Sequence, residues 1–223
     1  ASQIVSVGIH ATPETNPELA EAIPPIEFLG FDVTLFGVFI MIILGSIYGA
    51  AEYKCSAIRT SLLSITNRST FLVSKTLVWL VFSFFISFLS IFLTINMTHY
   101  VLGQDGLLLF SLNGTVWFYI FLASIAWTLL GLLAYIMALT FKTAIVPLLF
   151  LLPQVYSLGT FLANYISVAK FLPVALGQGL IATSPQILEH NSLQHILLLL
   201  CWSLSFLALA IYRLLKSDIG GGE

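Results

Sequence analysis

Five long stretches of the chain consist almost entirely of apolar residues, and more polar segments separate them. The stretches cover residues 33–51, 70–97, 114–140, 144–164 and 193–215. A helix needs about 20 mostly apolar residues to cross the hydrocarbon core of a bilayer. None of the stretches alternates between polar and apolar residues as a membrane β-strand does, and a backbone in lipid must form its own hydrogen bonds. The pattern therefore predicts five transmembrane α-helices.

Composition agrees with this pattern. Hydrophobic residues make up 59% of the 223-residue chain and charged residues only 8%, whereas a soluble domain carries about 25% charged residues. We therefore predict an all-α integral membrane protein with one transmembrane domain over residues 1–223. This length leaves no room for a soluble enzyme domain beside it. The net charge of −2 and the lack of a long basic run give no indication of a nucleic-acid partner.

The charged residues divide between the two sides of the predicted bundle. One side holds all but one of the basic residues, namely Lys54, Arg59, Arg68, Lys75, Lys142, Arg213 and Lys216. The other side holds Lys170 and most of the acidic residues, namely Glu14, Glu18, Glu21, Glu27, Asp32, Asp105 and Glu189. Because basic residues favour the cytoplasmic side, we expect a multi-pass protein of the plasma membrane with residue 1 outside and the C-terminus in the cytoplasm.

The polar stretch 1–32 then forms an external loop, and it does not contain a basic segment followed by an apolar one, as a signal peptide would. The simplest account of an external start is a further helix before Ala1, which gives six helices in all. The alternative is a protein with five helices.

The segment 52–69 joins the first two predicted helices on the cytoplasmic side. Ile58, Leu62 and Ile65 share one helical face, which predicts a short amphipathic helix on the membrane surface. The alternative is a basic loop that lies against anionic lipid headgroups.

Residues 52–75 resemble the permeases of bacterial ABC-2-type ATP-binding-cassette transporters. In that family a glutamate ends one transmembrane helix, and a basic residue, a leucine pair, a small-residue–Arg pair and a lysine follow. The corresponding residues in this sequence are Glu52, Arg59, Leu62, Arg68 and Lys75. The sequence departs from the family at Ser56-Ala57, where many members have Gly-Thr, and at Ile65-Thr66, which lacks the common proline.

The resemblance implies that the segment 52–69 is the coupling helix, which seats in a separate ATPase subunit and receives its movement. It implies an exporter in which two permease chains, identical or homologous, pair with two ATPase subunits that carry the ATP and Mg. The 18 Phe residues and the Trp residues in the spans suit amphiphilic or hydrophobic cargo, such as an antimicrobial peptide, a drug or a lipid. Antibiotic or peptide resistance is a role of related exporters.

Two segments are candidates for a translocation path. The segment 165–190 is apolar but too short and broken to span, and we predict a re-entrant pair of short helices that includes Pro173, Gly177 and Gly179. The alternative is an ordinary interfacial loop. Pro147 and Pro153 each remove a backbone donor and can kink the fourth predicted span.

Gly45, Ser46 and Gly49 form a face of small residues on the first predicted helix. Such a face suits close helix packing, and an interface between two permease chains is one place for it.

The sequence lacks the motifs of the common catalytic sites. It has no phosphate-binding G-x-x-x-x-G-K-[ST] loop, no serine-hydrolase elbow and no His-Glu-x-x-His helix. Its four histidines show no metal-ligand spacing. We therefore expect no cofactor or metal in this chain and no enzyme activity. The rival to a transporter is a membrane immunity or scaffold protein that sequesters a toxin or peptide at the outer face.

Overall fold

The structure, a computed structural model, describes residues 25–53, 68–103, 106–107, 112–155, 167–181 and 192–216. These residues form helices and connecting turns, with no strand among them. The α-helices are α3 (Phe31–Ala51), α5 (Arg68–Leu102), α6 (Gly114–Phe141), α7 (Ile145–Pro153), α9 (Pro173–Gln178) and α11 (Ser192–Lys216), and the 3-10 helices are η1 (Ile26–Phe28) and η5 (Ser167–Phe171).

Four helical segments are long and apolar enough to cross a membrane. They are Ile26–Ala51, Ser69–Leu102, Gly114–Phe141 and Ser192–Lys216. The predicted all-α membrane fold is therefore confirmed. The fourth predicted span, 144–164, begins as α7, and residues 156–164 lie outside the described residues.

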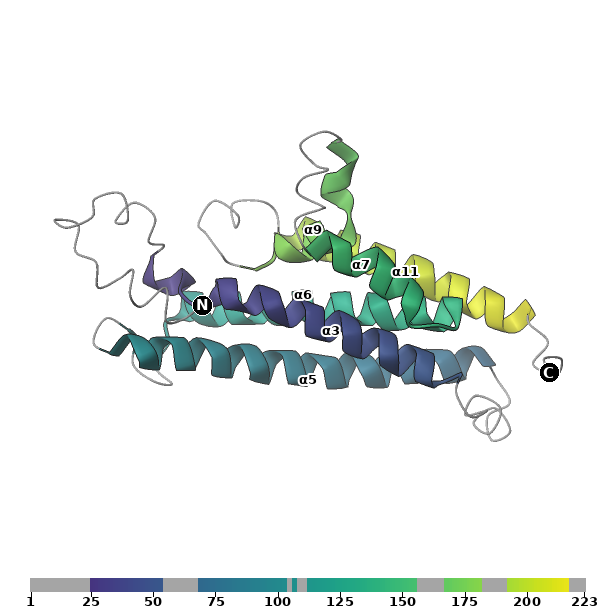
Figure 1. Ribbon diagram of the computed structural model, residues 1–223, viewed down its shortest axis with the longest axis horizontal. Helices are drawn as coiled ribbons and strands as arrows, with labels where there is room; N and C mark the ends of the chain where they lie inside the picture. The colour runs from purple at the N-terminus through teal and green to yellow at the C-terminus, as the bar shows by residue number, and fades with distance from the viewer. Residues whose placement is uncertain are drawn as a thin grey trace.

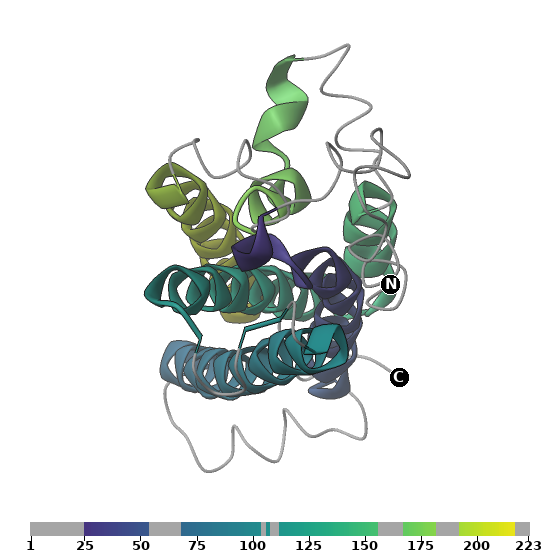
Figure 2. The same ribbon diagram turned by 90° about the vertical axis from the view of Figure 1, so that its left-hand side faces the viewer.

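Helix α6 is the centre of the bundle. The four long helices run side by side (Figure 1), and the end-on view places α6 between α5 and α11, with α3 beside both α5 and α6 (Figure 2). In its most apolar window 89% of α6 is buried, compared with 28% of α5 and 17% of α11. A helix that is apolar on all sides and covered on all sides forms a core. The outer faces of α5 and α11 are the apolar surface that faces lipid.

Glycines on one face of α3 allow its closest contact with α6. A Cβ on Gly45 would overlap the carbonyl oxygen of Gly131, and a Cβ on Gly49 would lie 2.5 Å from the carbonyl oxygen of Tyr135. The absence of side chains at these positions lets the two backbones approach. The packing that we expected from Gly45 and Gly49 therefore takes place within the chain, which leaves this face no room for an interface between two chains.

Helix α5 is longer than the hydropathy pattern predicts, because a polar run at its end continues the helix instead of ending it. Thr98 donates a hydrogen bond to the carbonyl oxygen of Thr94 at 3.0 Å, and Nδ1 of His99 accepts one from the N–H of Leu107 at 3.3 Å. With 35 residues, α5 is about 52 Å long and exceeds the roughly 30 Å hydrocarbon core. It therefore tilts or projects beyond the membrane.

Helix α3 begins at Phe31, two residues before the predicted span, so that Asp32 belongs to its first turn. Gly30 precedes it in the left-handed conformation with a φ of 90°, which glycine adopts without strain. Phe31 is fully buried and its ring meets that of Tyr119 edge-on at 6.0 Å. This aromatic contact places the start of the helix inside the bundle.

The α3–α6 contact gives the first prediction. Replacing Gly45 by Ala should destabilise the protein by about 2 kcal/mol, because the new methyl group forces the two backbones apart. Gly114→Ala is the matched control, since a Cβ there has no atom within 4 Å. Denaturant unfolding of the two purified variants in the same detergent measures the difference. Equal stability of the two variants would show that the backbones are not in close contact at Gly45.

Candidate functional site at the basic end of the bundle

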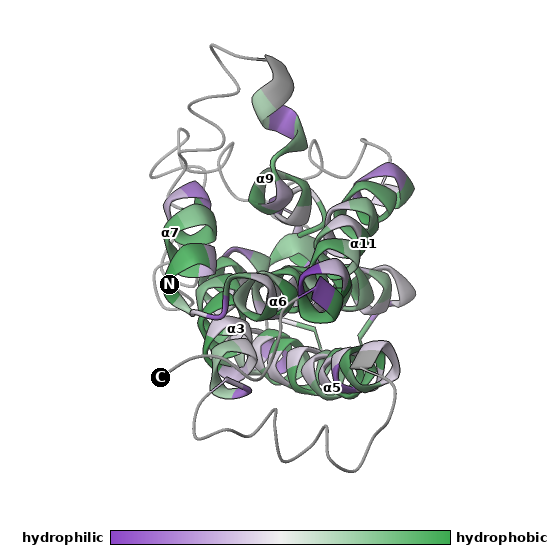
Figure 3. Cartoon of the chain, turned by 90° about the vertical axis from the view of Figure 1, so that its right-hand side faces the viewer, coloured by the Kyte–Doolittle hydropathy of each residue, from purple (hydrophilic) through white to green (hydrophobic). Residues whose placement is uncertain are grey.

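Four helices bring their charged residues to the same end of the bundle. Helices α3, α6 and α11 end there and α5 begins there (Figure 1, right). Figure 3 shows this end of the bundle, where hydrophilic residues lie at the ends of mostly hydrophobic helices. Its charged side chains among the described residues are Glu52, Lys75, Lys142, Arg213 and Lys216. We call this region the basic end.

An ion pair joins the two helices that flank the segment 54–67. Nζ of Lys75 donates a hydrogen bond to Oε1 of Glu52 at 2.8 Å. Glu52 is the residue directly after α3 and is 7% exposed, whereas the side chain of Lys75 in α5 is 35% exposed. The pair therefore fixes the end of α3 to the second turn of α5.

This pair unites two of the five residues expected to couple to an ATPase. Arg68 is the first residue of α5, and its side chain is not described. Arg59 and Leu62, with the rest of the expected amphipathic helix over 54–67, lie outside the described residues.

Two side chains, one from the turn after α3 and one from α11, satisfy two of the last carbonyl groups of α6. The hydroxyl of Tyr53, next to Glu52, donates to the carbonyl oxygen of Leu139 at 2.8 Å. Nη1 of Arg213 donates to the carbonyl oxygen of Thr140 at 2.9 Å. The last four carbonyl groups of a helix have no partner within the helix, and a buried one without a partner is costly. These two bonds thus join the ends of three helices.

Lys142 ends α6 in the left-handed conformation, with a φ of 57°. This conformation costs a non-glycine residue about 1 kcal/mol. Its ammonium lies 5.7 Å from the ring centroid of Tyr53, and the guanidinium of Arg213 lies 5.6 Å from that of Phe141. Cations over aromatic faces gain electrostatic energy, and the ends of α3, α6 and α11 therefore share both hydrogen bonds and cation–π contacts.

Burial raises the pKa of the Tyr53 hydroxyl to about 12, and the neighbouring Glu52 carboxylate adds to the rise while Arg213 opposes it. Tyr53 therefore remains protonated throughout the physiological pH range. Its hydroxyl stays a hydrogen-bond donor to α6 over that pH range.

The prolines of the predicted path have different positions in α7. Pro147 is buried in the first turn of α7, where the N–H groups of a helix have no intrahelical partner. Pro153 is the last residue of α7 and is exposed. The next two residues form a π-helical turn, and Nε2 of Gln154 donates to the carbonyl oxygen of Phe150 at 2.7 Å. The α-helix therefore ends at Pro153, which has no backbone N–H to donate.

The segment 165–190 contains two short helices in its described part, η5 and α9. Pro173 begins α9 and is buried. A Cβ on Gly177 would lie 2.5 Å from Cδ1 of Leu130 in α6, and one on Gly179 would lie 2.6 Å from Cε1 of His195 in α11. Both glycines therefore serve close packing of α9 in the bundle. Residues 165–166 and 182–190 lie outside the described residues.

Sequence reasoning missed Tyr53, Lys142 and Arg213 as parts of one site. In the sequence, Lys142 and Arg213 indicated only which side of the membrane these helix ends face. A tyrosine and basic residues at the ends of predicted spans were the available signal, because the last carbonyl groups of a buried helix require hydrogen-bond donors from outside that helix.

Comparisons with protein-family models, with curated proteins and with solved structures find no match for this chain. Among the described residues no three His, Cys, Asp or Glu side chains come together in a way that could hold a metal ion. Geometry and sequence resemblance are thus the grounds for a functional proposal.

The ion pair gives the second prediction. Lys75→Gln should cost about 2 kcal/mol of stability, because it leaves the buried Glu52 carboxylate without a counter-charge. Glu52→Gln should cost less than about 1 kcal/mol, since the more exposed Lys75 can turn to water or headgroups. Unfolding of both variants in detergent, with the exposed Lys170→Gln as control, measures which variant loses more stability. An equal loss in the two variants, or a larger loss in Glu52→Gln, would contradict the greater burial of Glu52.

Proposed function

We propose that the chain is the membrane-spanning permease subunit of an ATP-driven exporter. It moves an amphiphilic or hydrophobic substrate (a peptide, a drug or a lipid) across the plasma membrane. The ATPase is a separate subunit in two copies, which holds ATP and Mg, and a second permease chain, the same or homologous, completes the transporter. The basic end is the cytoplasmic end, and the C-terminus lies in the cytoplasm.

The observation that carries the proposal is the ion pair between Glu52 and Lys75. Both residues belong to the ABC-2-like motif, and they stand on either side of the segment 54–67. Their contact at 2.8 Å joins the end of α3 to α5. A push that a partner exerts on either of these two helices near the contact would therefore reach both.

The hydrogen bonds to α6 connect α3 and α5 to the remaining long helices. Tyr53 follows Glu52 directly and bonds to α6, and Arg213 links α6 to α11. Movement of the segment 54–67 would therefore reach α3, α5, α6 and α11 through polar contacts at one end of the bundle. Rigid-body movement of helices is how such machines alternate access between the two sides of a membrane.

The third prediction concerns the partner. Purification of the full chain from its native membranes in a mild detergent should bring with it a chain that hydrolyses ATP. Arg59→Glu should abolish both the association and any stimulation of ATP hydrolysis by substrate, because a reversed charge disrupts a bidentate contact to a partner carboxylate. Lys170→Glu, on the opposite side, is the matched control and should leave both unchanged.

Two results would contradict the proposal. One is normal association and normal ATPase stimulation in the Arg59→Glu variant. The other is protection of cells against a peptide without any ATPase partner, which would favour the immunity or scaffold alternative. Equal amounts of each variant in the membrane, measured by immunoblot, exclude a failure of insertion.

A further inference from the structure

A cationic cavity of about 490 Å³ lies between the ends of α6 and α11. Thr140, Phe141, Lys142, Tyr212, Arg213 and Lys216 line it. Helix α11 ends in the basic residues Arg213 and Lys216. Because α6 and α11 both have membrane-spanning length and both end here, the cavity lies at the level of the lipid headgroups.

The three cations of this cavity have no carboxylate partner among the described residues. The acidic side chain of the basic end, Glu52, is paired with Lys75. One nitrogen of Arg213 bonds to Thr140. Among the described residues, the ammonium of Lys216 has a long contact of 3.4 Å with the hydroxyl of Tyr212 and lies 5.7 Å from the centroid of the same ring. Several donors therefore remain for an anionic group, and guanidinium and ammonium groups bind phosphate well.

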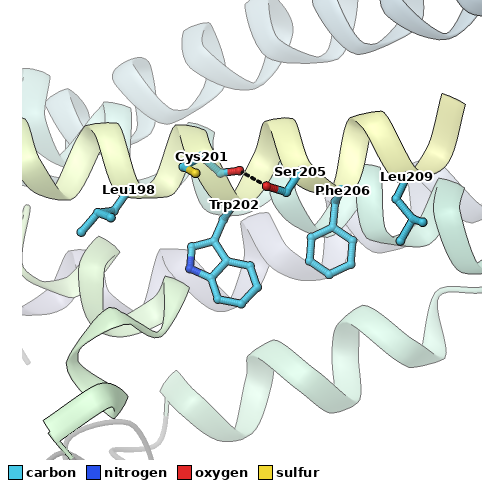
Figure 4. A pocket seen from close by; sticks show the side chains of 6 residues that line it. All are labelled: Leu198, Cys201, Trp202, Ser205, Phe206 and Leu209. Carbon is cyan, nitrogen blue, oxygen red and sulfur yellow. Dashed lines mark hydrogen bonds between the residues drawn. The ribbon is translucent and has the colours of Figure 1, made fainter. Parts of the chain in front are cut away.

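An apolar groove of about 350 Å³ lies along the same helix. Its lining residues on α11 are Leu198, Cys201, Trp202, Ser205, Phe206 and Leu209, and their side chains gather along one stretch of the helix (Figure 4). The polar Ser205 donates within the helix to the carbonyl oxygen of Cys201 at 2.7 Å. The groove thus presents an apolar and aromatic surface.

The groove and the cavity lie on one continuous face of α11. Residues 198, 202, 205, 209, 212 and 216 follow one another at intervals of four and three, which places them on one side of a helix. Leu209 and Phe206 lie about 10 Å and 15 Å below Lys216 along the axis. These distances are within one leaflet of a bilayer whose core is roughly 30 Å thick.

We propose that this face of α11 binds one anionic phospholipid, with its phosphate among Lys142, Arg213 and Lys216 and an acyl chain along Phe206 and Leu209. Charge complementarity selects an anionic headgroup, and the apolar groove selects a lipid over a free anion. The aromatic rings of Phe141 and Tyr212 lie at the boundary between the two parts, where amphipathic rings are favourable. The proposal rests on the fold alone and does not require the transport function.

Native mass spectrometry of the full chain in a neutral detergent tests this site. Titration with phosphatidylglycerol should give one bound lipid per chain, with at least tenfold weaker binding of phosphatidylcholine that has the same acyl chains. Lys216→Gln should weaken phosphatidylglycerol binding roughly fivefold, and Lys216→Arg should retain it. The exposed Lys170→Gln should bind as the unaltered chain does. Leu209→Asn should also weaken lipid binding by shortening the apolar groove.

Three results would overturn the proposal. Equal binding of the two lipids would show that charge does not select the ligand. An equal loss in Lys170→Gln and Lys216→Gln would show a diffuse effect of net charge. Full competition by inorganic phosphate at millimolar concentration, with no effect of Leu209→Asn, would identify a free-anion site. Circular dichroism of each variant confirms the helical fold, and Lys216 is exposed, so its replacement leaves the core intact.

Discussion

The burial of α6 imposes the constraint on which the rest of the bundle depends. A helix surrounded by other helices in lipid has little water to satisfy its last carbonyl groups. Tyr53, in the turn after α3, and Arg213 of α11 supply the donors, and the Glu52–Lys75 pair connects α5 to the same end of the bundle. Polar contacts at one level of the membrane therefore hold together helices that are otherwise joined by apolar packing.

Apolar contacts alone do not determine which helices pack together, because lipid chains are as apolar as the helix surfaces. Between α3 and α6 the fit of the two surfaces determines the pairing, because glycines allow the neighbouring backbone to come close. Trp79 adds a polar link from α5, since its Nε1 donates to the carbonyl oxygen of Gly131 at 3.3 Å. Its ring also stacks with Tyr48 and Tyr135. Close backbones, aromatic stacking and the joint at the basic end together fix the position of α3 and α5 on α6.

Much of the fold was predictable from hydropathy. Long apolar runs in a chain with few charges leave helices as the available structure, and α6 and α11 begin and end within one residue of the predicted spans. The extension of α5 was not predictable, because a polar run such as Asn96–His99 often ends a helix in water. Here Asn96 and Thr98 donate to carbonyl groups of the preceding turn of α5, and Nδ1 of His99 accepts a bond from Leu107. Which helix Gly45 and Gly49 meet also depends on the three-dimensional arrangement.

The candidate site was predictable only in part. The resemblance named Glu52 and Lys75 without stating their contact, and the roles of Tyr53 and Arg213 depend on where α6 ends relative to α3 and α11. Contacts of this kind join residues up to 86 positions apart. Local sequence patterns do not indicate which distant residues pair. The ends of the predicted spans indicate only that polar partners are needed there, because each helix end requires them.

If the basic end acts as one mechanical unit, Lys75 and Arg213 are energetically coupled, and a double-mutant cycle between Lys75→Gln and Arg213→Gln measures that coupling. These residues lie on α5 and α11, at the two ends of the chain of contacts. The effect of the double variant on the free energy of unfolding in detergent should differ from the sum of the two single effects by more than about 0.5 kcal/mol. Additive effects on the free energy of unfolding would show that the two contacts act independently, and they would contradict a basic end that acts as one unit.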